Sequence, residues 1–169
     1  MKKYITLLLI APLLSQDYSW PTGTGKNLSS NFGEFRTTGY HLGIDVKTKG
    51  TEGHPIYAIE DGYVSRIVTN YSGFGKALYY RLTDGKIAVY AHLSTFSPKL
   101  EERLKEEQEK SQSYLTNFFP KKDEFSFSKN DVIAYSGNTG FSFGPHLHFE
   151  LRDEKGNILN PLTNGINQP

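Results

Sequence analysis

Short runs of β-branched and aromatic residues alternate with turns along the chain from Pro55 onward. The runs read PIYAIE, YVSRIV, KALYYRL and IAVYAHL, and they are separated by Asp61-Gly62, Ser72–Gly75 and Asp84-Gly85. This composition is typical of β-strands, and Asp-Gly between two such runs is a strong hairpin signal. Two later runs, DVIAYSG and LHFELRD, flank a loop over 137–145. The pattern predicts a mostly β protein built on antiparallel strands.

One segment, Pro98–Leu115, has a helical composition rich in Glu, Lys, Gln and Leu. Pro98 suits the first turn of a helix, and Ser97 is a candidate cap. The apolar stripe of this helix is narrow, so we expect a surface helix near 98–115 that packs only slightly; the stripe consists of Leu100, Leu104, Ser111 and Leu115. The phenylalanine-rich segment 116–129 has no readable pattern, and its aromatic residues would allow it to fold back over the sheet.

The first residues have the pattern of a secretory signal peptide. Lys2 and Lys3 precede an apolar run, Tyr4–Leu14, which Pro12 interrupts and polar residues follow. A membrane-spanning helix needs about 20 apolar residues, so we expect cleavage and no stable membrane insertion afterwards. We predict a signal peptide over 1–16 with an approximate boundary, because no A-x-A site precedes it. The mature domain, 17–169, would then act outside the cytoplasm, in the periplasm, the cell envelope or the medium.

Composition narrows the chemistry that this domain can perform. The 169 residues suffice for one core, and we expect a monomer. Nineteen basic residues against 18 acidic ones give a net charge of +1, which disfavours binding to nucleic acid or to an anionic membrane surface. With no cysteine, the chain has no disulfide, thiolate nucleophile or zinc-thiolate site. Any metal ion must be held by His, Asp or Glu.

Four of the five histidines lie in three short motifs: His41-x-x-x-Asp45, YAHL with His92, and His146-Leu147-His148. Residues two apart in a strand share a face, so the last motif can place two imidazoles together. Extended chain would separate the residues of the first motif by about 13 Å, too far for one ion, so the chain must bend there. Gly43 lies at the middle of that interval. The fifth histidine, His54, is interpreted as an ordinary turn residue.

Two histidines and one aspartate can hold a catalytic zinc ion without any thiol and leave a position open for water. The other histidines would then handle protons near neutral pH.

Five blocks of the sequence together resemble the lysostaphin-type zinc peptidases, peptidase family M23. The blocks are SSNFG at 29–33 with Arg36, HLGID at 41–45, PIYAIEDGYV at 55–64, YAHLS at 90–94 and SGNTGFSFGPHLHFEL at 136–151. The resemblance extends from about Trp20 to about Pro161. It implies the fold of that family, an antiparallel β-sheet with a groove, also described as duplicated-hybrid-motif-like.

The resemblance also implies roles for five residues. His41, Asp45 and His148 would be zinc ligands, and His92 and His146 the catalytic pair. A metal-activated water would attack a peptide carbonyl, with the pair acting as base, proton donor and oxyanion stabiliser; which histidine does which is left open. The implied substrates are peptide cross-links or bridges of bacterial peptidoglycan, with the cleaved bond also left open.

A second function stays open, because some relatives have lost ligands and activate other cell-wall hydrolases as non-catalytic regulators or binding modules. All five positions are filled here, which favours the secreted enzyme.

The chain departs from the family pattern in two places. Phe141 and Phe143 are bulky where relatives usually have small residues, and we interpret them as hydrophobic packing rather than as substrate contacts. The interval of about 96–127 is longer than the short connection of most relatives, so we predict an insertion. It could cover the cleft or dock a regulatory protein at 98–127, and the simplest interpretation is a solvated surface helix.

Overall fold

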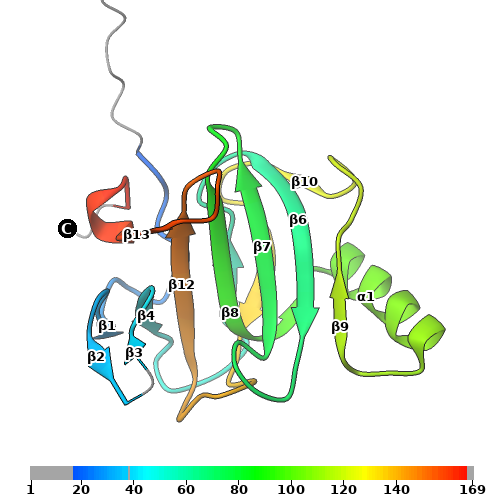
Figure 1. The fold of residues 1–169 in the computed structure, drawn as a ribbon, viewed down its shortest axis with the longest axis horizontal. Helices are drawn as coiled ribbons and strands as arrows, with labels where there is room; N and C mark the ends of the chain where they lie inside the picture. The colour runs from blue at the N-terminus through cyan, green and yellow to red at the C-terminus, as the bar shows by residue number, and fades with distance from the viewer. Residues whose placement is uncertain (1–16, 38, 167–169) are drawn as a thin grey trace, which may run out of the picture.

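Eleven strands join in one antiparallel sheet in the computed structural model, which describes residues 17–37 and 39–166 (Figure 1). The central strands, in spatial order, are β1 (Leu28–Ser30), β4 (Ile44–Lys47), β12 (His146–Arg152), β8 (Ile87–Phe96), β7 (Lys76–Leu82), β6 (Gly62–Thr69) and β10 (Ser126–Phe127). Four more join at their ends and edges: β5 (Pro55–Tyr57), β9 (Thr116–Phe118), β11 (Val132–Ser136) and β13 (Ile158–Leu159). The predicted mostly β, antiparallel fold is confirmed. The predicted signal peptide lies outside the described residues.

Two short strands, β2 (Phe35–Arg36) and β3 (Gly39–Tyr40), form a separate hairpin before β4, and a short 3-10 helix, η1 (Pro161–Thr163), follows β13. No helix among the described residues is long and apolar enough to cross a membrane.

The central strands divide their side chains between two faces. On β12 the core receives Leu147, Phe149 and Leu151, each fully buried. Since neighbouring residues of a strand point to opposite sides, His146, His148, Glu150 and Arg152 all lie on the other face. This second face, called the site face below, carries most of the residues that the sequence marks as chemically important.

The predicted helix is present as α1 (Pro98–Ser111), but its packing, its cap and its end differ from the prediction. Leu100 and Leu104 are fully buried in the main core, so the helix packs firmly rather than slightly. Ser97 occupies the N-cap position without capping, because its hydroxyl makes no hydrogen bond and is buried. Leu115 lies beyond the helix and is 48% exposed.

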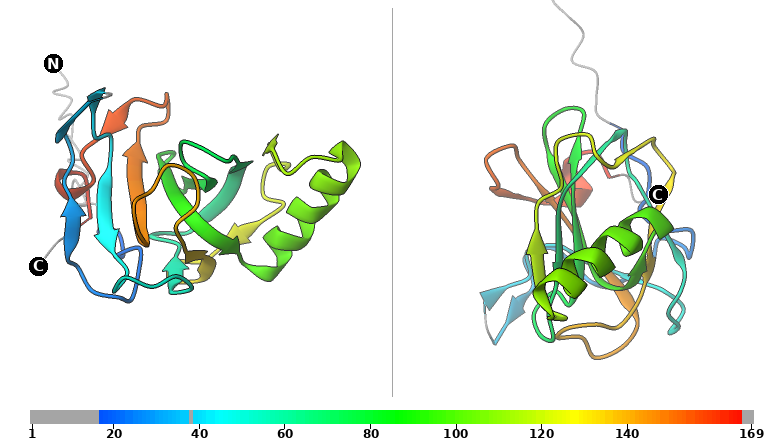
Figure 2. Two further views of the ribbon diagram at one scale, coloured as in Figure 1. Left: turned by 90° about the horizontal axis from the view of Figure 1, so that it is seen from below. Right: turned by 90° about the vertical axis from the view of Figure 1, so that its right-hand side faces the viewer.

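The segment after the helix extends the sheet instead of folding over it. Both β9 and β10 pair with β6 in antiparallel register. Helix α1 and these strands therefore build the β6 side of the molecule, at the opposite end from β1 and β4 (Figure 2). Hydrogen bonding along β6 joins this segment to the central sheet.

Candidate metal centre

Three polar side chains meet where β4 and β12 pair. His148 stands directly opposite Asp45 in the register of these strands. His41 reaches them because the chain bends at Gly43, as the spacing predicts. An added Cβ on Gly43 would lie 2.3 Å from the Phe149 carbonyl oxygen, so only glycine lets this bend approach β12 so closely.

The three donor atoms form a nearly equilateral triangle. His41 Nε2 is 3.1 Å from Asp45 Oδ1 and 3.0 Å from His148 Nδ1, and the latter two atoms are 2.9 Å apart. Tetrahedral ligands of zinc at about 2.1 Å stand about 3.4 Å from one another. All three residues are at least 94% buried, since they expose 3%, 6% and 5% of their surface. The triangle therefore has the donor types and nearly the spacing that a zinc ion requires, and these residues could hold a metal ion.

A further contact fixes the orientation of each side chain in the triangle. Nδ1 of His41 donates to the Asn31 carbonyl at 2.8 Å, which leaves the Nε2 lone pair for a metal. Nε2 of His148 donates to Glu150 Oε1 at 3.1 Å, which leaves Nδ1 available. Arg36 donates to the second oxygen of Asp45 at 2.7 Å. Such outer contacts orient the ligands, and the Glu150 carboxylate also raises the basicity of His148.

The electrostatics agree with an anionic carboxylate among imidazoles. Burial alone would raise the pKa of Asp45, but the imidazoles of His146, His148 and His41, when protonated, favour its anion and hold the pKa far below its usual range. Burial alone would lower the pKa of His148, but the adjacent carboxylates of Asp45 and Glu150 favour its protonated form and raise the pKa overall. Burial raises the pKa of Glu150, but its contacts with His148 and Arg152 lower it by more, so the pKa falls overall.

His92 joins the centre through an irregularity in β8. Tyr90 points into the core, so regular alternation would send His92 there as well. Instead Lys76 pairs with Leu93 and Leu78 with Tyr90, so two residues of β8, Ala91 and His92, oppose the single residue Ala77 of β7. His92 absorbs the extra residue with a left-handed φ of 59°. A bulge of this kind re-aims a side chain, here toward the site face.

His92 and His146 lie side by side with 4.8 Å between ring centres. Nδ1 of His92 donates to the Thr139 carbonyl at 2.8 Å, and Nδ1 of His146 donates to the Gly144 carbonyl at 2.8 Å. In this tautomer both Nε2 atoms keep a lone pair, and that of His146 is 3.6 Å from Asp45 Oδ1. Burial lowers the pKa of His92 to about 4, against a smaller opposing effect of its hydrogen bond to Thr139. His92 is therefore neutral at pH 7 and can accept a proton.

The structure thus brings all five residues singled out in the sequence into one cluster. His54 lies apart and bonds Thr51 in its own turn, as expected. Sequence reasoning missed Glu150, although its position two residues after His148 on the same strand was a readable signal. It also missed Phe74, whose ring stacks on His148 with 5.3 Å between centres and whose position had no comparable signal.

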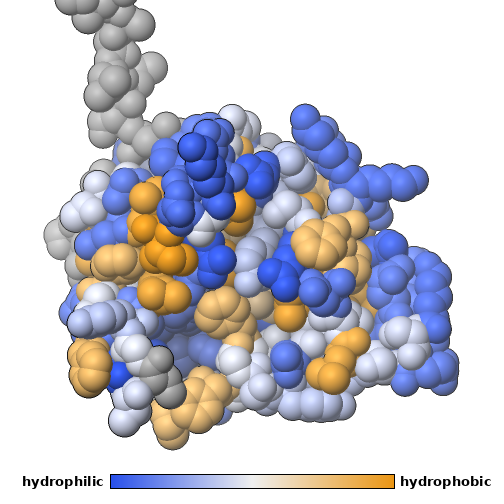
Figure 3. Space-filling view, viewed as in Figure 1, coloured by the Kyte–Doolittle hydropathy of each residue, from blue (hydrophilic) through white to orange (hydrophobic). Residues whose placement is uncertain are grey.

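Exposed aromatic pairs flank the centre on two sides. Phe141 and Phe143, in the loop that also bonds His146, are 69% and 94% exposed and contact each other edge to face. Phe35 and Tyr40, on the hairpin leading to His41, are 80% and 68% exposed and form a similar pair. The interpretation of Phe141 and Phe143 as packing residues is wrong, since they pack on little besides each other. Figure 3 shows a hollow beside the lower part of β4 and β12 with hydrophobic residues on its rim.

Comparison with known proteins agrees with this geometry. The family model for peptidase family M23 matches residues 39–118. The chain is 30% identical over 129 residues to the DD-carboxypeptidase/endopeptidase Mpg of Neisseria meningitidis, covering 76% of this chain and 24% of that protein. It is also 30% identical over 145 residues to the murein hydrolase activator NlpD of Salmonella typhimurium, covering 86% and 30%. The chain therefore spans less than a third of the length of these relatives.

A solved structure supports the fold. A zinc-containing peptidase from Vibrio cholerae superposes with a TM-score of 0.63 at 21% identity, over 86% of this chain and 39% of that one. At this identity the match concerns the fold alone, which is the one that the sequence blocks imply. One relative is an enzyme by name and the other an activator, so the comparisons by themselves leave the activity open.

Proposed function

The chain contains a domain of peptidase family M23, and on that premise we propose that it is a zinc-dependent endopeptidase. The proposed substrates are peptide cross-links or bridges of bacterial peptidoglycan. One observation carries the proposal: two histidines with available Nε2 atoms stand beside a buried His-His-Asp triangle. The name of the Neisseria relative, a carboxypeptidase and endopeptidase, supports a peptide substrate.

Zinc is the proposed cofactor, held by His41, Asp45 and His148. The donor set of two imidazoles and one carboxylate suits catalytic zinc, which keeps a fourth position open. Its second support is the zinc-containing peptidase that shares the fold. When bound, zinc would supply Lewis acidity, which lowers the pKa of a coordinated water and polarises the scissile carbonyl.

The chain's own residues would then move protons and position the peptide. His92 and His146 lie beside the triangle and each keeps Nε2 free, so either could take a proton from the attacking water and return it to the leaving amine. The protonated ring would also stabilise the developing oxyanion. We propose that the exposed pairs Phe35–Tyr40 and Phe141–Phe143 contact the peptide on the two sides of the centre.

The predicted insertion, 96–127, lies along β6, whereas the triangle lies at β4 and β12. We therefore propose that it borders the site face rather than covering the metal centre, where it could also dock a regulatory protein. A substrate in the cell wall, together with the predicted signal peptide over 1–16, supports a location outside the cytoplasm.

The proposal is tested with purified variants, zinc analysis and digestion of purified cell walls. We expect His148→Ala to lose both zinc and wall hydrolysis. We expect His146→Ala to keep zinc and to lose about 100-fold or more in rate, because it removes proton transfer but no ligand. His54→Ala is the matched control and should change neither. Full activity of His146→Ala with zinc retained would overturn the role assignment.

A second candidate is an activator of other wall hydrolases, favoured by the murein hydrolase activator among the relatives. The same assay separates the two. An activator would release no wall fragments alone but would increase release by an added hydrolase, and His146→Ala would not alter that increase. Wall fragments released by the chain alone would identify the enzyme.

A further inference from the structure

The site face continues beyond the metal centre across β8 and β7 to β6. On β7 the core receives Leu78 and Tyr80, so Tyr79 points to the site face. Arg66 of β6 pairs with Tyr79 in the register and shares its face. Arg152 of β12 lies on this face too, four residues after His148. We call Arg66, Tyr79 and Arg152 the arginine strip.

Contacts within the strip hold both guanidinium groups in place. The guanidinium carbon of Arg66 is 4.7 Å from the centre of the Tyr79 ring, and that of Arg152 is 5.6 Å from the same centre. Arg66 also lies 5.5 Å from the Phe119 ring and donates to Asn117 Oδ1 at 2.7 Å. Phe119 and Asn117 belong to the segment after α1, so the predicted insertion contributes to holding Arg66.

The two arginines differ in their charge partners. Arg152 donates twice to Glu150, at 2.6 and 2.8 Å, so its charge is largely neutralised. Arg66 forms no ion pair with any carboxylate of the described residues; its polar partner is the neutral amide of Asn117. A guanidinium that is stacked, oriented and free of a carboxylate can recognise a planar carboxylate of a ligand.

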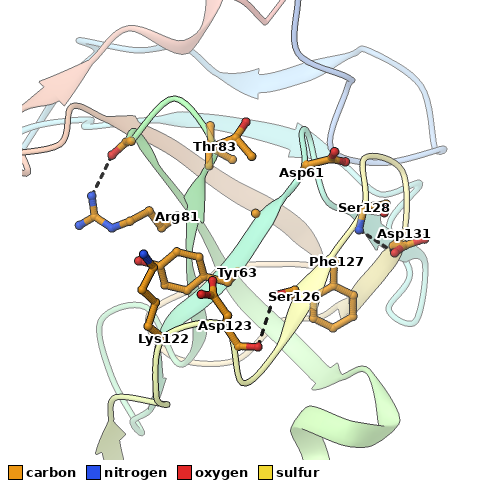
Figure 4. A pocket seen from close by; sticks show the side chains of 13 residues that line it. Asp61, Tyr63, Arg81, Thr83, Lys122, Asp123, Ser126, Phe127, Ser128 and Asp131 are labelled. Carbon is orange, nitrogen blue, oxygen red and sulfur yellow. Dashed lines mark hydrogen bonds between the residues drawn. The ribbon is translucent and has the colours of Figure 1, made fainter.

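Beyond the strip, a cavity of about 590 Å³ carries charges of both signs. Arg81 stands opposite Tyr63 across β6 and β7, and both line this cavity with Lys122 (Figure 4). Arg81 donates to the carbonyl of Gly85 in its own hairpin and, like Lys122, has no ion pair among the described residues. Asp61, Asp123 and Asp131 also line the cavity, so the excess of positive charge is confined to the strip itself. With a net charge of only +1, the chain has a local cationic site and not a general polyanion surface.

The distance from the metal centre sets which part of a substrate would reach the strip. Arg66 stands in register with Glu150 through Tyr79 and Val89. It therefore lies two residues along the strand direction from His148, about 7 Å, and three strands away, at about 5 Å each. The two components combine to about 16 Å, which an extended peptide covers in about five residues.

On the basis of the proposed function, we propose that the arginine strip binds a free carboxylate of the cell-wall peptide about four to six residues from the scissile bond. Arg66 supplies the contact, and Tyr79 with Arg152 supports it. The chain would therefore prefer peptides with free carboxyl groups to otherwise identical peptides in which those groups are amidated.

The experiment compares one cross-linked muropeptide in its free and its amidated form. For the unmodified protein we expect KM to be about tenfold lower for the free form than for the amidated form, because one charge-assisted contact contributes about that much. We expect kcat to be similar for the two forms. Arg66→Gln should raise KM on the free form to the amidated value and leave the amidated form unchanged. Arg66→Lys should recover part of the preference, since it keeps the charge without the planar fork. Lys99→Gln, which removes one exposed positive charge on α1, is the matched control and should change nothing.

A binding measurement separates failure of this inference from failure of the proposed function. Titration calorimetry with linear, uncross-linked stem peptides, free and amidated, detects the preference without any hydrolysis. If Arg66→Gln weakens both forms equally, the effect is packing and the inference is wrong. Equal affinity of the unmodified protein for both forms would also overturn it. If the preference appears in binding but no wall peptide is cleaved, the inference stands and the proposed enzyme activity fails.

Discussion

The two ends of the strand order, one around β4 and β12 and the other around β6, are held together in different ways. They are called the metal side and the β6 side below. At β4 and β12, buried polar groups are held by other polar groups: each ligand of the triangle has a second contact, through the Asn31 carbonyl, Arg36 or Glu150. At β6, the strands and α1 are attached by backbone pairing and by leucines in the core. The first side is therefore organised around buried polar groups, and the second around backbone pairing and an apolar core.

Glu101 of α1 links the two sides. Glu101, in the first turn of α1, accepts hydrogen bonds from the Thr95 hydroxyl at 2.8 Å and the Phe96 amide at 3.0 Å. It also pairs with Lys76 at 3.1 Å. These residues lie on β8 and β7 near His92. The helix is therefore anchored next to β8, the strand that carries His92, and is not merely a solvated surface helix.

The largest effect is expected on the β6 side, where removing a buried leucine should lower the stability of the fold. Leu104→Ala should lower the free energy of unfolding by about 2–5 kcal/mol, because it leaves a cavity in the core. Chemical denaturation measures this change. Leu115→Ala removes the same side chain at an exposed position and should cost less than about 0.5 kcal/mol. Equal effects of the two changes would mean that α1 packs as loosely as its sequence suggests.

An intermediate effect is expected on the metal side, where the quantity that changes is the affinity for zinc. Glu150→Gln should weaken zinc binding about 10- to 100-fold, because the amide no longer provides the anionic acceptor that orients His148. Competition with a chromogenic chelator measures the affinity without any turnover. Glu154→Gln, an exposed glutamate nearby on the chain, is the control and should have no effect. Unchanged affinity in Glu150→Gln would show that His148 keeps its orientation by packing alone.

The smallest effect concerns a polar group on the apolar side. Ser97 has a buried hydroxyl without a partner, so Ser97→Ala should be neutral or should stabilise by up to about 1 kcal/mol. A capping serine would instead lose about 1 kcal/mol. The matched comparison is Asn160→Ala, since Asn160 does accept from the Leu162 amide at the start of η1 and should lose about that amount. Thermal unfolding of both variants measures whether each change raises or lowers stability. If Ser97→Ala is destabilised, Ser97 does cap the helix and this prediction is wrong.

Prediction from the sequence was most accurate where the information is local. Hairpin signals and strand composition predicted the antiparallel sheet, and the bend at Gly43 followed from the ligand spacing. The helix at 98–111 followed from composition, but its burial did not, because two leucines in a charged segment do not say whether a core lies beneath them. The strands β9 and β10 were not predicted, since each is only two or three residues long and depends on pairing with β6.

The sequence by itself predicted the strand pattern and placed His146 and His148 on one face, because residues two apart in a strand share a face. The full set of five residues came from the resemblance that the five sequence blocks carry. Tertiary structure alone decided which neighbour each of those side chains meets. The bulge at His92 exists only because β7 pairs with β8 out of regular register, and Arg66 meets Arg152 across Tyr79 only because of the order of the strands. The alternation of residues along a strand predicts which face of the sheet a side chain lies on. Its neighbours are set by the pairing of segments that lie far apart in the chain.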